Sequence, residues 1–172
     1  MVAAQLQKEL AEEIRRLTAE MSFNNPNGPA KLNVYEQNLP MRKTTSELSA
    51  LEESEMDEDS DPTESDTFPY IIVRLSGGRS ESATSSHNIK VILIAGIYDN
   101  TLDARGHIHI LNIFEKIRER FRKNPSLNGR YLCGDEISWE LQDEDDETFP
   151  YFFGGMAMNW ITAEFRREDY LA

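Results

Sequence analysis

The protein has 172 residues, of which 18 are Lys or Arg and 31 are Asp or Glu, so its formal net charge is -13 at pH 7. This balance argues against general affinity for nucleic acids, because binding to phosphates depends on Lys and Arg side chains. No stretch approaches the roughly 18 consecutive apolar residues of a membrane span, and the first residues lack the pattern of a secretory signal. We therefore expect a soluble, non-exported protein with no membrane partner.

The negative charge is concentrated in one segment. Ten acidic residues and no basic residue lie between Thr44 and Thr67, and the rest of the chain carries 21 acids against 18 bases. Low hydrophobicity combined with high like charge is typical of segments that cannot bury enough surface to offset their ordering entropy. The sequence therefore predicts a flexible acidic linker over residues 24–67.

The first residues form an amphipathic pattern. Apolar side chains recur at helical spacing, at Val2, Leu6, Leu10, Ile14, Leu17 and Met21. This period predicts a helix over residues 1–23, which ends where Asn24 to Pro29 bring turn-forming residues together. We expect its apolar stripe to pack either on the protein's own core or on a neighbouring subunit.

The remaining residues, 68–172, are predicted to form the core domain. Alternating or unbroken apolar runs predict strands at residues 69–75, 89–98, 137–141 and 151–165, the second of them central and covered on both faces. Helical spacing predicts a long helix at residues 103–123. Gly154 and Gly155 predict a bulge in the last strand. The expected fold class is α+β, with an antiparallel or mixed sheet of about four strands packed on one long helix.

No catalytic residue, cofactor site or metal site is predicted. His107 and His109 lie at a helix start, where residues two apart point to different sides, so edge histidines are a better interpretation than metal ligands. Cys133 has no recognisable base beside it and is interpreted as a small apolar residue. The carboxylates of residues 143–147 lack the spacing and glycine of a calcium loop.

The charge of the predicted core is divided between two segments. Between Arg105 and Arg130 there are seven bases and two acids, whereas between Asp135 and Glu147 there are eight acids and no base. Such a subunit can meet copies of itself head to tail, and contacts of this kind close into rings when the rotation permits. An ordinary mixed surface is the alternative.

One phrase occurs twice: Thr-Phe-Pro-Tyr precedes both the first and the last predicted strand of the core, ending at Tyr70 and at Tyr151. Together with the segments 68–75, 89–100, 110–121, 137–141 and 149–160, this order resembles the tail terminator (tail completion, or head-tail joining) proteins of tailed bacteriophages. The resemblance covers about residues 68–167. The N-terminal helix and the acidic linker depart from the pattern as additions.

The resemblance implies a virion protein of the tail end or neck, assembled in the bacterial host cytoplasm and without enzymatic activity. Such proteins form a homo-oligomeric, usually hexameric, ring on the tail tube. The ring ends tail polymerisation and presents a surface for head-tail joining, a step that precedes viral genome ejection. The implied partners are further copies of the chain, the tail tube protein and head-tail connector proteins, with DNA only passing through the lumen.

The residues expected at subunit or partner interfaces belong to the two Phe-Pro-Tyr phrases, the basic helix end and the acidic loop. They are Phe68, Pro69, Tyr70, Arg118, Arg120, Arg122, Lys123, Asp143, Glu144, Asp145, Asp146, Glu147, Phe149, Pro150 and Tyr151. Two alternatives remain open: a head-side connector or stopper ring of the phage neck, and an acidic protein that mimics DNA through residues 44–67. An enzyme is the weakest interpretation.

Overall fold

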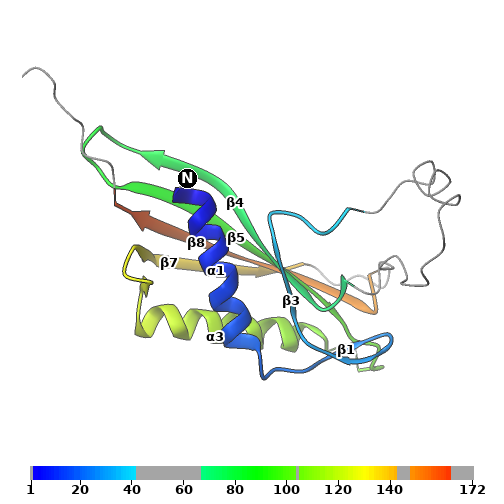
Figure 1. Ribbon diagram of the computed structural model, residues 1–172. Helices are drawn as coiled ribbons and strands as arrows, with labels where there is room; N and C mark the ends of the chain where they lie inside the picture. Colours follow the sequence, from blue (N-terminus) through cyan, green and yellow to red (C-terminus); the bar gives the residue numbers. More distant parts are fainter. Residues whose placement is uncertain (1, 42–66, 104, 143–147, 164–172) are drawn as a thin grey trace, which may run out of the picture.

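Two helices cover one face of a six-stranded mixed sheet, which gives an α+β architecture (Figure 1). The computed structural model describes residues 2–41, 67–103, 105–142 and 148–163. The elements are α1 (Val2–Thr18), β1 (Phe23–Asn25), β2 (Gly28–Ala30), β3 (Asn33–Glu36), β4 (Tyr70–Ser80), β5 (His87–Tyr98), α3 (His107–Lys123), β6 (Ser126–Leu127), β7 (Tyr131–Leu141) and β8 (Tyr151–Thr162).

The main sheet has the strand order β3-β4-β5-β8-β7-β6. Only β3 and β4 are parallel, and the other neighbours are antiparallel. β5 is central, as its apolar run predicts. One of its faces is buried beneath the helices, whereas Lys90 on the other face is exposed and Ile92 and Ile94 are only half-buried. The expectation that β5 is covered on both faces is therefore wrong over this half of the strand.

The helices bury their apolar stripes on the same face of the sheet. α1 packs against β3 and β4, and α3 packs against β5, β7 and β8. In α1 the spacing of Leu6, Leu10 and Ile14 aligns these fully buried side chains. In α3, Phe121 meets Trp160 edge to face at a centroid distance of 4.9 Å, a favoured geometry for aromatic rings. The N-terminal helix is thus part of the protein's own core.

The sheet is larger than the sequence predicts. The expected fold has about four strands on one long helix, but the described residues form six strands in the main sheet and two helices over it. β3 lies within the segment predicted to be linker, and its residues pair with residues 70–73 of β4. β1 and β2 form a separate hairpin in that segment. Residues 42–66, which carry most of the acids of the predicted linker, lie outside the described residues.

The predicted bulge at Gly154 and Gly155 is wrong. The pairing of β8 with β5 and with β7 is continuous through both glycines, and the register shifts lie instead between Leu75 and Gly77 and between Cys133 and Ile137. Close approach explains Gly154, because a Cβ there would lie 2.9 Å from Cγ2 of Ile110 in α3. Glycines in strands mark either bulges or close contacts, and Gly154 marks the close contact between β8 and α3.

Candidate interaction surface

The two Phe-Pro-Tyr phrases come together at one end of the sheet, on the face opposite the helices. They precede β4 and β8, which lie on either side of β5 and run in the same direction. The rings of Phe68 and Tyr151 are 4.7 Å apart, and Phe68 also contacts Tyr70 at 4.9 Å and Phe153 at 6.0 Å. Both Phe-Pro peptide bonds are cis. Phe68, Tyr70 and Tyr151 of the repeated phrase therefore belong to one aromatic cluster, whereas Phe149 contacts Phe152 of the core beneath the helices.

The aromatic cluster is buried at its centre and partly exposed around it. Phe68 and Tyr70 are 8% and 6% exposed, and burial raises the pKa of the Tyr70 hydroxyl. The Tyr70 ring lies across Gly96, where a Cβ would be 2.4 Å from Cζ of the ring. Tyr151 is partly exposed and Phe149, at 40%, is the most exposed of the phenylalanines at this end. The cluster is thus mainly a second small core, and only its rim is accessible.

Beside the aromatic cluster, the same sheet face has no covering element among the described residues. A shallow groove of about 540 Å³ lies there, and it is lined by Lys90, Ile92, Ile94, Ser138, Glu140, Phe153, Gly155 and Ala157 among others. Its lining combines apolar side chains with the polar side chains of Lys90, Ser138 and Glu140. Gly155, which has no side chain, and Ala157 lie between larger lining residues on β8.

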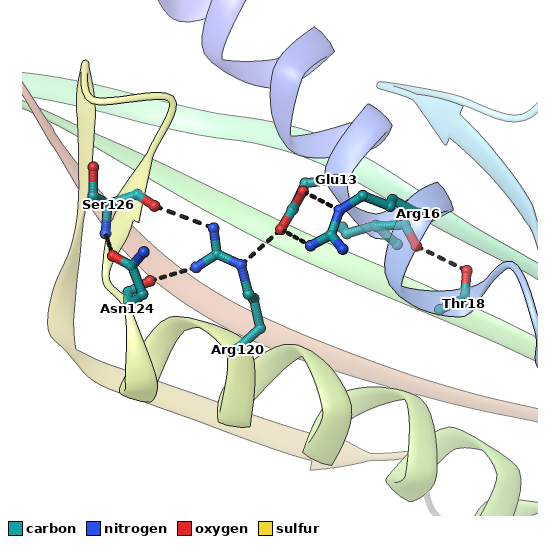
Figure 2. A network of polar contacts seen from close by, with 7 residues as sticks. Glu13, Arg16, Thr18, Arg120, Asn124 and Ser126 are labelled. Carbon is teal, nitrogen blue, oxygen red and sulfur yellow. Dashed lines mark hydrogen bonds and ion pairs between the residues drawn. The ribbon is translucent and has the colours of Figure 1, made fainter.

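The basic end of α3 is less available than the sequence predicts, because α1 supplies acids to it. Arg120 is the clearest case: its Nε donates to Oε1 of Glu13 at 2.6 Å, and its side chain also donates to the carbonyl oxygens of Asn124 and Ser126 (Figure 2). Arg16 hydrogen-bonds the same carboxylate and, ahead of Arg120, lowers the pKa of Glu13. Arg120 therefore ties α1, α3 and β6 together within one subunit.

Two further bases of this region have acidic partners. Arg118 pairs with Glu115 at 2.9 Å, and Lys123 pairs with Glu119, in both cases along the exposed side of α3. Arg122 is exposed as well. The excess of bases counted in this segment is therefore partly compensated by its own acids and by those of α1. The acidic residues 143–147 lie outside the described residues.

A second carboxylate of α1 that the sequence analysis missed is Glu9, which is 5% exposed. It accepts hydrogen bonds from Asn128 at 2.6 Å, from Gln5 at 2.9 Å and from Arg130. Burial raises the pKa of Glu9, but these hydrogen bonds outweigh burial, and the net shift is downward. The only sequence signal for the burial of Glu9 is its position three residues after Leu6 and next to Leu10, which places it on the buried side of α1.

The histidines and the cysteine are engaged in the fold. Nε2 of His109 lies 3.2 Å from Oδ2 of the buried Asp99, which joins the first turns of α3 to the end of β5. Burial raises the pKa of Asp99, and hydrogen bonds from Thr101 and His109 lower it further than burial raises it. Burial also raises the pKa of Cys133 to about 11. In the described part of the chain no three His, Cys, Asp or Glu side chains are grouped as metal ligands.

Comparisons with models of known protein families and with characterised proteins give no match. None of the helices in the described ranges is long and apolar enough to cross a membrane.

Proposed function

We propose that this protein is a structural assembly protein that forms a ring on the end of a bacteriophage tail tube, ends tail polymerisation and provides the head-tail joining surface. One observation carries the proposal: the ordered set of segments at residues 68–75, 89–100, 110–121, 137–141 and 149–160 that resembles tail terminator proteins. A hexamer is the expected ring, and the virion neck is its expected place.

The packing of these segments supports the proposal. The three longest strand segments lie side by side as β4, β5 and β8. α3 covers β5 and β8, and α1 covers β4. Phe68 and Tyr151 of the two Phe-Pro-Tyr phrases meet although they are distant in the sequence. A resemblance whose parts form one contiguous unit is more informative than scattered matches, because the segments can then act as one module.

The available surfaces suit contact between subunits better than catalysis. The groove beside the aromatic cluster is shallow and lined by both apolar and polar side chains, and the exposed bases of α3 lie on the other side of the sheet. We propose that Arg118, Arg122 and Lys123 face residues 143–147 of the next subunit. Arg120 is left out of this interface because its partners lie in its own subunit. DNA passes through the lumen without being bound, since an acidic wall repels phosphates.

The experiment that tests this function uses the purified protein and separately purified tail tube protein. Electron microscopy of the protein alone should show rings about as wide as a tail tube. When the protein is added to polymerising tubes, their mean length should fall as its concentration rises. Rings that bind portal-bearing heads but leave tube length unchanged would favour a connector or stopper ring instead, and the absence of rings under all conditions would contradict both.

The proposed charge contact has its own test. Replacing Asp145 and Asp146 by Lys should weaken the ring, because like charges then meet across the interface. The control is replacement of Glu52 and Glu53 by Lys, which changes the net charge equally but within the acidic segment. Light scattering should give a lower oligomer mass for the first variant and an unchanged mass for the control. Equal masses for both variants would remove residues 143–147 from the interface.

A further inference from the structure

The backbone pairing differs between the two sides of the main sheet. At the β4 edge, β3 pairs with residues 70–73, and the side chain of Gln37 continues the pairing. Its Oε1 accepts a hydrogen bond from the Leu75 N–H at 3.0 Å, and its Nε2 donates to the Leu75 carbonyl at 3.3 Å. Gln7 of α1 donates to the same Oε1 at 2.9 Å. A side-chain amide therefore takes the place of a strand beyond the end of β3, and the outer side of β4 is paired as far as Leu75.

The opposite edge, at β7, is open. β6 pairs only with Tyr131 and Leu132, and the N–H of Cys133 donates to the carbonyl of Pro125 at 2.8 Å. After the register shift between Cys133 and Ile137, no strand of the described ranges pairs with the outer side of residues 137–141. Unpaired backbone N–H and C=O groups along an edge are a template for a further strand.

The side chains of this edge segment differ between its two faces. Ile137, Trp139 and Leu141 pair with residues of β8 that face the helices, and Trp139 is 49% exposed. A hollow of about 320 Å³ separates Trp139 from the outer side of α3. Ser138 and Glu140 lie on the uncovered face and are both exposed. Trp139 therefore presents a large, half-exposed ring at an unpaired strand edge, where a further strand could cover it.

We propose that β7 pairs with β7 of a second copy of this chain, antiparallel and centred on Trp139. In this register Trp139 meets its own counterpart, Ile137 meets Leu141, and Ser138 meets Glu140, each pair on one face. The apolar side chains then stack with apolar ones, and each Ser138 hydroxyl can donate to a Glu140 carboxylate. Within residues 137–141 no like charges are directly opposite, and such pairs would destabilise the contact.

The pattern of charges supports a second copy as the occupant. Charged residues on an edge strand commonly prevent such pairing, but residues 137–141 contain a single charge, and the symmetric register places a hydroxyl opposite it. Asp135 and Glu136 lie in the irregular stretch outside the pairing residues. A two-fold contact is satisfied by two copies and cannot by itself close a six-membered ring. The pairing is therefore additional to the proposed ring and does not depend on it.

The first experiment measures self-association of the full chain by sedimentation velocity over a range of concentrations. The Ser138→Glu variant places two carboxylates opposite each other at two symmetric positions, and it should raise the dissociation constant of the contact about 2- to 30-fold. The matched control is the exchange Ser138→Glu with Glu140→Ser, which keeps the composition and restores the pairing of a hydroxyl with a carboxylate. It should associate like the native chain. Equal association of all three proteins would overturn the proposal.

The second experiment reports the register and is independent of any ring. Trp139→Cys should form an intermolecular disulfide under mild oxidation, because the residue meets itself across the two-fold axis. Ser138→Cys alone should cross-link poorly, but a mixture of Ser138→Cys with Glu140→Cys should cross-link well. The native Cys133 is buried and should not compete. Failure of Trp139→Cys to cross-link, or equal yields from every variant and mixture, would contradict the register. A strand of a different protein at this edge would give no self-cross-link.

Discussion

Replacing Arg120 by Met tests whether this arginine acts within the subunit or between subunits. The substitution keeps much of the apolar stem but removes the donors to Glu13 and to two backbone carbonyls. The two side chains of the ion pair are 20% and 13% exposed, so the pair is neither fully buried nor freely solvated. Hydrogen bonds to charged groups contribute about 1.5–3 kcal/mol each when partly buried.

Because Arg16 still pairs with Glu13 in the variant, the carboxylate is not left without a partner, and we expect a loss of about 2 kcal/mol in the free energy of unfolding. For a domain of this size that corresponds to a fall of roughly 4–8 °C in Tm. Thermal and urea unfolding followed by circular dichroism would measure it. Arg118→Met is the matched control on the same helix, since its partner Glu115 is exposed, and it should leave the midpoint unchanged.

A double-mutant cycle with Glu13→Gln isolates the pair itself. A coupling free energy of about 1 kcal/mol or more between residues 13 and 120 is expected for contacting side chains in one network. If Arg120→Met and Arg118→Met have the same midpoint, or the coupling is zero, the assignment of Arg120 to the interior of the subunit is refuted. A fall in oligomer mass without a change in stability would instead restore Arg120 to the subunit interface.

Three further predictions follow from the buried groups. The pKa of Asp99 is lower in the folded protein than in the unfolded chain, so the ionised carboxylate stabilises the fold above the unfolded pKa. This stabilisation is lost as the pH falls through the folded pKa. The Asp99→Asn variant should therefore show a flatter acid side in a plot of urea midpoint against pH. Gly96→Ala should cost about 1–3 kcal/mol in the free energy of unfolding because its Cβ meets the Tyr70 ring, whereas Gly77→Ala meets nothing within 4 Å and should cost less; denaturant unfolding of both variants would show it. The Cys133 thiol, with a pKa of about 11, should react with a disulfide reagent at pH 8 far more slowly in the folded than in the unfolded protein. Three results would each contradict the corresponding prediction. They are an acid side as steep in Asp99→Asn as in the native protein, equal unfolding free energies for the two glycine variants, and a Cys133 thiol that reacts as fast in the folded as in the unfolded protein.

The helices and the longest strands could be predicted because each carries its own period. The spacing of apolar residues in α1 and α3 indicates a buried stripe whatever covers it, and the long apolar run of β5 indicates a central strand. β3 could not be predicted in this way. It has four residues, and it exists as a strand because residues 70–73 offer a parallel partner.

The charges of the candidate interface could likewise be predicted only in part from the sequence. Counting residues along the chain reveals a basic segment and an acidic one, and that count remains correct. It does not reveal that Glu13 and Glu9, more than one hundred residues earlier, pair with Arg120 and Arg130. A long-range ion pair depends on the packing of α1 against the rest of the core, and no local pattern encodes it.

The amino-acid sequence by itself therefore determined the class of the fold, the position of the long helix and the central strand, and the concentration of negative charge in one segment, since these are properties of neighbouring residues. The tertiary structure alone decided that the N-terminal helix belongs to the core, that Phe68 and Tyr151 of the two Phe-Pro-Tyr phrases meet, and that Gln37 extends the pairing of β4 whereas residues 137–141 of β7 have an unpaired outer side. The physical reason is that burial and pairing depend on which surfaces meet, and distant parts of the chain supply those surfaces.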